Sequence, residues 1–265
     1  MQLSTVAEAE PGGGRDIVLA AVGLLKKFGF TRAVDYVSLE IPRGEVLCVI
    51  GPNGAGKTTL LLLLGGVILP SAGHVTVFGM HRWKDNFEIR KRSTFLTAEP
   101  IFGASPTPYE FLRFYGQIYE LPKAVFLERV RRLAGEMDMI PHLKKPWTKL
   151  SLGMKKKTGL IASFLPDAEL RFLDEPFAGG IDPKAMDRLY LWMQDAAERG
   201  ETVVFSTQVL EQAESAADRI LLMEKGAVTA MGTPAELIAS AGIAPGAARP
   251  LYKAFLALTA VDEEP

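Results

Sequence analysis

The sequence of 265 residues predicts an α/β fold with a β-rich edge and an inserted helical lobe. A short apolar run at 45–50 has the length and composition of a buried strand, and a glycine-rich loop joins it to an apolar helix start at 60–64. Between about 106 and 163 the apolar residues recur at helical spacing. From Leu170 onward strands and helices alternate again, which is typical of a parallel sheet with helices on its faces.

The individual elements follow from periodicity, caps and turn residues. Strands are expected at 17–25, 38–41, 45–50, 73–79, 170–173 and 202–206, and as a hairpin at 220–223 and 227–230. Helices are expected at 107–119, at 124–136, from about 155, at 183–199, at 211–217 and from 234. Thr107, Asp182 and Thr233 are suited to cap three of these helices, because each precedes a proline at the first helical position. Pro122 and Gly200 mark the ends of two of them.

Composition limits the classes of function. With 48% hydrophobic and 23% charged residues, the chain can bury one substantial core and a smaller lobe. The net charge of -1 gives no overall basic field, so no nucleic-acid partner is expected. Cys48 is the single cysteine, which excludes an internal disulfide and favours a reducing compartment, and within a strand it is expected to be a core residue. The longest apolar run, 60–69, is about half of the roughly 20 residues that a membrane span requires.

Both ends of the chain differ from the rest in composition. Residues 1–16 are predicted to be a disordered tail, without the basic start and apolar segment of a secretion signal. Residues 241–265 are predicted to be an extension of the main domain at 17–240. The apolar residues at 251–259 have two possible explanations. They could pack on the core, or they could form a C-terminal segment of the kind found in related subunits.

The strongest motif is a phosphate-binding loop of the form G-x-x-x-x-G-K-[ST]. Its residues are Gly51, Pro52, Asn53, Gly54, Ala55, Gly56, Lys57, Thr58 and Thr59. Glycines let the backbone curl so that successive N–H groups point at phosphate oxygens, and the following helix adds its positive end. Lys57 would reach the terminal phosphates and the Thr58 hydroxyl would ligate Mg²⁺. A glycine-rich turn that binds nothing is the alternative, and the complete motif in its strand-to-helix context argues against it.

A pair of carboxylates, Asp174 and Glu175, follows the apolar strand at 170–173. Asp174 would hold Mg²⁺, directly or through water, while Glu175 would orient and deprotonate an attacking water. The alternative is a pair of surface acids at a strand end. Arg171 inside this strand has no explanation from the sequence.

Two further features are weaker by themselves. Phe28 could stack on an adenine ring by its face, or it could fill the local core. The string LSLGM at 150–154 precedes a helix, and its Ser151 could grip an anion or act as an ordinary N-cap.

Taken in order, these features resemble the nucleotide-binding subunit of ABC transporters over roughly 17–240. The segments that carry the resemblance are Phe28, the loop at 51–58, the LSLGM string at 150–154, the acidic pair at 174–175 and the segment GIDP at 180–183. The resemblance implies a P-loop nucleoside triphosphatase (NTPase) core with a helical subdomain at about 100–163. It also implies ATP and Mg²⁺ as cofactors, and a separate transmembrane permease that holds the chain peripherally at the cytoplasmic face. The helical lobe and the segment 100–108 would press on this permease.

The resemblance also implies roles for the remaining site residues. Phe28 would stack on adenine, Lys57 and Thr58 would hold phosphate and Mg²⁺, Asp174 would support the metal, and Glu175 would be the base. Ser151 and Gly153 would contact the γ-phosphate held by a second subunit, so that two ATP molecules join a head-to-tail dimer. Asp182 would lie in the loop that links the two sites.

The sequence departs from the family pattern at three places. Ala98 stands where the family usually has a glutamine that touches Mg²⁺ and water, and Glu99 could replace it only by a shift of one residue. Gln208 stands in place of the usual histidine. It can donate a hydrogen bond to the γ-phosphate, but it cannot become cationic. Leu152 and Met154 change the signature string in a way that resembles the ABC-2 type exporter group.

These departures predict good ATP binding with slow turnover. Losing one polar contact made in the transition state can slow hydrolysis by roughly ten- to a thousandfold. A homodimer and a heterodimer both remain open, and pairing with a complete ATPase would supply one competent site. The main alternative is a soluble ABC-type regulatory ATPase or mechanical clamp without a transport partner. A kinase or small GTPase is less favoured, because Glu175 favours attack by water.

Overall fold

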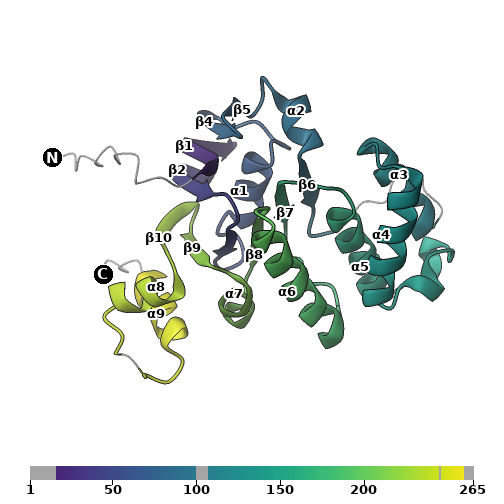
Figure 1. Ribbon diagram of the computed structural model, residues 1–265. Helices are drawn as coiled ribbons and strands as arrows, with labels where there is room; N and C mark the ends of the chain where they lie inside the picture. Colours follow the sequence, from purple (N-terminus) through teal and green to yellow (C-terminus); the bar gives the residue numbers. More distant parts are fainter. Residues whose placement is uncertain (1–15, 100–106, 245, 260–265) are drawn as a thin grey trace.

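The computed structural model describes residues 16–99, 107–244 and 246–259, which form two sheets with helices around them. The smaller sheet has four antiparallel strands in the order β2-β1-β4-β5. Its strands are β1 (Ile17–Phe28), β2 (Thr31–Pro42), β4 (Ala72–Val77) and β5 (Met80–His81). This sheet is the β-rich edge that the sequence predicts, and it lies at the top left of Figure 1 with the N-terminal end of the described chain.

The larger sheet carries the functional loops. Its six strands lie in the order β10-β9-β3-β8-β7-β6, and all neighbours are parallel except the β9/β10 hairpin. The strands are β3 (Val46–Ile50), β6 (Ser93–Leu96), β7 (Leu170–Leu173), β8 (Thr202–Thr207), β9 (Arg219–Glu224) and β10 (Ala227–Gly232). Ile50 pairs with Thr207, and Leu96 pairs with Leu173. The segments that follow β3, β8, β7 and β6 therefore emerge side by side at one edge, where α/β proteins bind their ligands.

Helices cover both faces of this sheet. They are α1 (Lys57–Leu64), α2 (Asn86–Lys91), α3 (Pro108–Ile118), α4 (Lys123–Glu136), α5 (Leu152–Phe164), α6 (Pro183–Glu198), α7 (Leu210–Ala216), α8 (Pro234–Ser240) and α9 (Pro250–Thr259). Two short 3-10 turns at Ile140–His142 and Trp147–Lys149 join α4 to α5. Figure 1 shows α3 and α4 beyond the β6 end of the sheet and α8 and α9 below β10.

The core is divided by the central strand. Cys48 and Ile50 face one apolar cluster, which includes residues of α3 to α6, while Leu47 and Val49 face a second cluster with α1 and the small sheet. All five residues of β3 are buried. This burial on both faces explains why the strand is a continuous apolar run, and it confirms Cys48 as a core residue.

Most predicted elements are confirmed, and two need correction. The signature helix does not begin near Lys155. It begins at Leu152, because Ser151 is its N-cap and accepts a hydrogen bond from the Met154 N–H. The first two strands run further than 17–25 and 38–41, so Phe28 is the last residue of β1 rather than part of a loop. Register shifts along the β1/β2 pair let these long strands continue through positions that interrupt the alternation of side chains.

The C-terminal helix α9 packs on the rest of the molecule, which is the first of the two explanations given for residues 251–259. Leu251 and Ala254 of α9 are buried, and Leu251 belongs to the larger core cluster. Residues 1–15 of the predicted tail (1–16) and residues 100–106 of the segment 100–108 lie outside the described residues. Within the parts of the chain that are described, no helix has both the length and the apolar character needed to cross a membrane.

Candidate functional site

The loop between β3 and α1 has the tight form that the motif predicts. Gly56 is the N-cap of α1 with a φ of 101°, and a Cβ at this position would lie 2.2 Å from the Ala33 carbonyl oxygen. Only glycine satisfies both conditions. The Ala55 N–H bonds back to the Pro52 oxygen, which closes a turn just before the helix. The loop at 51–56 therefore delivers the chain to an N-terminus whose N–H groups suit an anion.

Lys57 is the charge at the centre of this loop. Its Nζ donates hydrogen bonds to the Gly51 and Pro52 oxygens at 2.9 and 3.2 Å. The same atom lies 3.7 Å from a carboxylate oxygen of Glu175, and 7% of the Lys57 side chain is exposed. A cation held this firmly by its own loop is a preorganised partner for phosphate oxygens.

Asp174 is held by two hydroxyl groups. The Thr58 Oγ1 lies 2.9 Å from one carboxylate oxygen and 3.1 Å from the other, and the Ser206 Oγ lies 2.6 Å from Oδ1. The Asp174 N–H donates to the Leu96 carbonyl at 2.8 Å, which ties the end of β7 to the end of β6. Thr58 comes from α1 and Ser206 from β8, so residues from separate elements converge on one carboxylate.

Glu175 stands next to this carboxylate in an unusual backbone conformation. Its φ is 45°, in the left-handed region that residues with a Cβ seldom occupy, and its N–H donates to the Ser206 Oγ at 2.9 Å. Burial raises the pKa of the Glu175 carboxyl, while the Lys57 ammonium opposes that shift. A carboxylate with a raised pKa is a better acceptor for the proton of a water molecule.

The donor set at this point fits a magnesium ion. Thr58 offers a hydroxyl oxygen and Asp174 a carboxylate oxygen, and both are hard ligands of the kind that Mg²⁺ takes together with phosphates. Such an ion would neutralise charge on the phosphates.

Other predicted residues do not touch this centre. Phe28 is 55% exposed, and its ring contacts only the Lys26 ammonium, at 5.0 Å from the centroid, among the interactions of described residues. Gln208 follows β8 and is exposed, and its side chain has no hydrogen bond within the described chain. Both positions leave a side chain available to a ligand rather than committed to the core.

The signature segment forms a second centre with the segment 179–182. Gly153 has no room for a side chain, because a Cβ there would lie 2.4 Å from the Gly180 oxygen. Asp182 caps α6 by accepting the Ala185 N–H, and its carboxylate pairs with the Lys157 ammonium at 2.5 Å. Within the described residues, no hydrogen bond or ion pair joins Ser151, Gly153 or Asp182 to the loop at 51–58.

The sequence analysis missed two side chains near the carboxylates. Ser206 bonds to both Asp174 and Glu175, and Lys156 of α5 donates to the backbone at the ends of β6 and β7. The only signal for Ser206 is a hydroxyl at the end of an apolar strand, and Lys156 is one of three successive lysines. Glu99 is exposed, and its carboxylate has no hydrogen bond or ion pair to another described residue, although its carbonyl accepts from the Thr97 hydroxyl.

Comparisons with known proteins identify relatives of this chain. A family model described as ABC transporter matches residues 34–178. The daunorubicin resistance ATP-binding protein DrrA3 of Streptomyces coeruleorubidus is 32% identical over 227 residues, which cover 86% of this chain and 72% of that protein. The probable multidrug ABC transporter ATP-binding protein YbhF of Escherichia coli is 31% identical over 230 residues, which cover 87% of this chain and 39% of YbhF. The chain thus matches less than half the length of YbhF.

A solved structure supports the same grouping. The structure of an ATP binding subunit of an ABC transporter superposes with a TM-score of 0.84 at 28% sequence identity. The superposition covers 91% of this chain and 99% of the solved one.

Proposed function

Because this chain belongs to the ABC transporter family, we propose that it is the subunit that binds and hydrolyses ATP to drive a separate membrane permease. The convergence of Lys57, Thr58 and the pair Asp174–Glu175 beside the phosphate loop carries the proposal. A helix N-terminus and a buried ammonium suit phosphate, and a carboxylate with raised pKa suits the activation of water.

Each site residue has a proposed part in this reaction. Lys57 and the backbone N–H groups of the loop bind the β- and γ-phosphates, and Glu175 accepts a proton from the attacking water. Thr58 and Asp174 hold Mg²⁺. The exposed ring of Phe28 stacks on the adenine, and the exposed amide of Gln208 donates to the γ-phosphate.

The second centre completes the site of another subunit. Ser151 is exposed at the N-terminus of the 13-residue helix α5, where the positive end of the helix favours an anion. Within the described residues, no hydrogen bond or ion pair ties Ser151 or Gly153 to the phosphate loop of the same chain, which leaves them to meet the γ-phosphate bound by a partner. We place Asp182 at the same dimer face. Ala98 and Gln208 favour a heterodimer with a complete ATPase, with a homodimer as the alternative.

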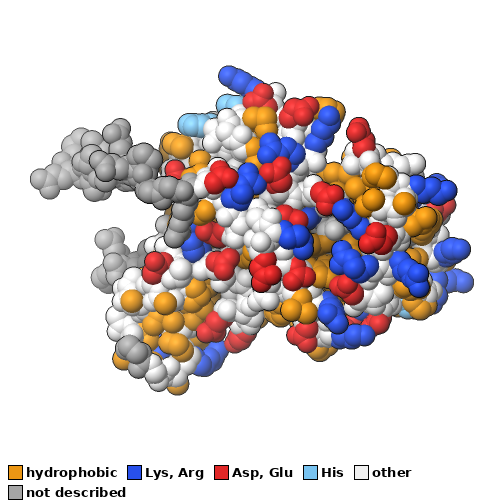
Figure 2. Space-filling model, in the orientation of Figure 1, with side chains coloured by type: hydrophobic (Ala, Val, Ile, Leu, Met, Phe, Trp, Pro, Cys, Tyr) orange, Lys and Arg blue, Asp and Glu red, His pale blue; other side chains and the backbone are white. Residues whose placement is uncertain are grey.

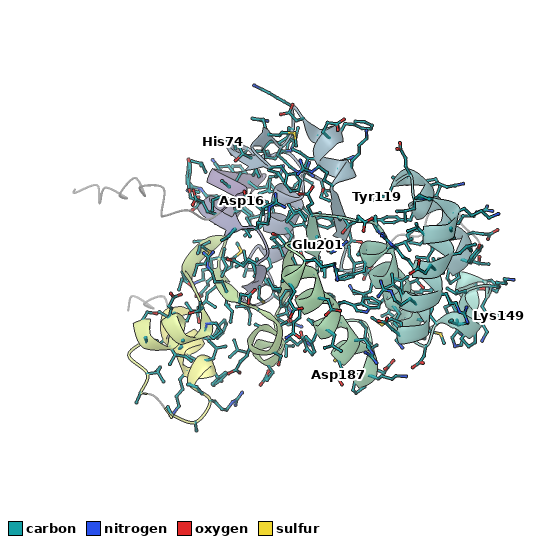
Figure 3. All side chains as sticks on the ribbon, viewed as in Figure 1. Asp16, His74, Tyr119, Lys149, Asp187 and Glu201 are labelled. Carbon is teal, nitrogen blue, oxygen red and sulfur yellow. The ribbon has the colours of Figure 1, made fainter. Side chains whose placement is uncertain are left out.

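A groove between α2, β6 and α3 is the proposed permease contact. It has a volume of about 580 Å³. The side chains that line it include Val67, Phe87, Tyr115, Ile118 and Tyr119, with Arg90 and Lys91 at the rim. Figure 1 shows β6 between α2 and α3, Figure 2 shows hydrophobic side chains at the surface in this region, and Figure 3 labels Tyr119 at this place. The occupant we propose is an amphipathic segment of the permease that carries acidic residues opposite Arg90 and Lys91.

Two observations support this contact. Val67, Phe87 and Ile118 are 49%, 70% and 55% exposed, which is unusual for large apolar side chains gathered at one groove. The Tyr119 hydroxyl donates to the Ser93 carbonyl at 2.7 Å, so the wall from α3 is fixed to β6. A partner bound here would keep the chain at the cytoplasmic face of a membrane.

The signature string favours an exporter of the ABC-2 type, and the transporter names of the relatives argue against the soluble regulatory alternative.

Nucleotide binding and turnover by the purified chain test the first part of the proposal. A fluorescent ATP analogue should bind in the presence of Mg²⁺, and Lys57→Ala should abolish that binding. Glu175→Gln should retain binding but lose about a hundred- to ten-thousandfold in turnover, because only the proton acceptor is removed. Glu214→Gln makes the same change at an exposed position of α7 and should leave both values unaltered. Equal turnover in Glu175→Gln and wild type would contradict the role given to Glu175.

Affinity purification from detergent-solubilised membranes tests the permease. A multi-helix membrane protein should accompany the wild-type chain, and Ile118→Glu should lose it while still binding ATP. A second ATPase in the same eluate would establish the heterodimer. If no membrane protein is recovered with either chain, the transport role fails.

A further inference from the structure

We propose that Lys156 is a positioning residue that connects α5 to the hydrolytic carboxylates by holding the backbone ends of β6 and β7. This inference rests on the function proposed above. No contact between Lys156 and nucleotide is part of it, because the geometry points to an action through Asp174 and Glu175.

The ammonium of Lys156 is surrounded by main-chain carbonyls. Its Nζ lies 2.9 Å from the Ala98 oxygen, 3.2 Å from the Asp174 oxygen and 3.5 Å from the Thr97 oxygen. The residue is 2% exposed, and it has no ion pair within the described parts of the chain. Burial lowers the pKa of Lys156 to about 8, against the opposing attraction of Asp174 and Glu175. A buried cation with carbonyls as its only close partners fixes those carbonyls relative to one another.

The three carbonyls belong to two segments that position the carboxylates of the site. Thr97 and Ala98 follow β6, and Asp174 follows β7. The Asp174 N–H already binds the Leu96 oxygen at the end of β6, and the Glu175 N–H binds the Ser206 Oγ. Lys156 donates a hydrogen bond to the carbonyl oxygen of the peptide that joins Asp174 to Glu175. That peptide is thus held from β8 through its N–H and from α5 through its oxygen. The left-handed φ of Glu175 requires such support on both sides.

Lys156 also belongs to the face of α5 that begins at the signature segment. Leu152 and Lys156 are four residues apart and lie on one side of the helix. A Cβ at Gly179 would lie 3.6 Å from Leu152 Cγ and 3.9 Å from Lys156 Cβ, so the segment after Glu175 packs over both residues. Leu152 is 61% exposed at the start of the helix. If a contact moves this exposed end of α5, Lys156 transmits the movement to the Asp174–Glu175 peptide.

Hydrogen exchange of the nucleotide-free chain tests the connection directly. Lys156→Met keeps the apolar stem but removes the donors, and it should raise the exchange of the Asp174 and Glu175 amides by about tenfold or more. Lys155→Met makes the same change at the neighbouring lysine, whose side chain has no hydrogen bond or ion pair with another described residue, and it should leave these amides at the wild-type rate. Lys156→Arg retains several donors and should restore at least part of the protection.

Three results would overturn the inference. Exchange at Asp174 and Glu175 could stay at the wild-type rate in Lys156→Met, or it could rise equally throughout the sheet, which would indicate a general loss of stability. Exchange as fast in Lys156→Arg as in Lys156→Met would assign the effect to packing alone.

Kinetics give a second, independent readout. Lys156→Met should lower kcat by about tenfold or more while KM and the affinity for the ATP analogue stay within about threefold of wild type. A loss of affinity as large as the loss of kcat would contradict a positioning role. Failure of the proposed function has a different signature, since the wild-type chain itself would then bind no nucleotide while its exchange pattern could still be measured.

Discussion

Replacing Arg171 with methionine should strongly destabilise the protein. Arg171 lies inside β7 and is 2% exposed. Its guanidinium donates to the Ser163 oxygen at 2.6 Å, the Pro166 oxygen at 3.2 Å and the Glu201 carboxylate at 2.7 Å. Figure 3 labels Glu201 near the middle of the molecule, between α6 and β8. Burial lowers the pKa of the Arg171 guanidinium and Glu201 opposes that shift, so each charge depends on the other.

The expected loss follows from what the methionine leaves behind. The Glu201 side chain is 16% exposed, and removal of its buried partner should cost about 3–5 kcal/mol, with the carbonyls of Ser163 and Pro166 losing their donor as well. Arg199 provides a matched control, because it pairs with the same carboxylate at 3.0 Å but is 57% exposed. Arg199→Met should therefore cost no more than about 1 kcal/mol. The burial of the arginine, rather than the identity of its partner, therefore decides how much stability is lost.

Urea denaturation measures this difference. Trp192 is buried and its ring centroid lies 5.3 Å from that of Phe164, which itself stacks with Arg171, so tryptophan fluorescence reports on this part of the core. The double variant Arg171→Met with Glu201→Leu should recover part of the loss, because no carboxylate remains that has lost its buried partner. If Arg171→Met were no less stable than Arg199→Met, the reasoning from burial would be refuted.

Three further predictions concern the two centres of the site. Gln208→His should raise turnover by about tenfold or more without altering ATP affinity, measured by phosphate release, and an unchanged rate would count against the explanation for slow hydrolysis. Gly153→Ala should lower the free energy of unfolding in urea by about 1–3 kcal/mol and weaken ATP-dependent dimerisation in size-exclusion chromatography, because its Cβ would lie 2.4 Å from the Gly180 oxygen. Wild-type behaviour in both assays would show that Gly153 and Gly180 do not approach each other this closely. The hydrogen bond from Lys157 holds the pKa of Asp182 below its usual value, so this stabilisation is present above about pH 4 and is lost as the pH falls through the folded-state pKa. The excess stability of wild type over Asp182→Asn, which keeps an N-cap acceptor, should accordingly be constant from neutral pH to about pH 4 and shrink as the pH falls further, and a difference independent of pH would exclude the ion pair as its source.

Local chemistry explains why much of the fold could be predicted from the sequence. The phosphate loop is recognisable because glycine is required at fixed positions next to a lysine, and Gly56 indeed has a backbone that other residues seldom adopt. Thr233 caps α8 as expected, where Glu236 completes a capping box, and Asp182 caps α6 as expected. These signals lie within a few residues of the structure that they specify.

The remaining features depend on residues that are distant in the sequence. Arg171 had no explanation because its partner Glu201 follows 30 positions later and the accepting carbonyls carry no side-chain signal. Ser206 and Lys156 reach Asp174 across 32 and 18 positions. The start of α5 differs from the predicted one by about three residues, because Ser151 caps the helix and the first turn therefore begins at Leu152.

Of the three departures from the family pattern, we expect Ala98 and Gln208 to affect hydrolysis rather than binding. The contacts that hold Lys57, Thr58 and Asp174 in place beside the loop involve neither Ala98 nor Gln208. What Ala98 lacks is a polar side chain at the end of β6, yet its carbonyl is bound by Lys156, so the backbone there is still tied to α5 and to β7. The geometry of Glu175 then depends on ties to β8 and α5, and α5 is the helix whose exposed start we assign to the dimer face. We therefore expect ATP to bind to a single chain, while the rate of hydrolysis responds to whatever subunit docks on the start of α5.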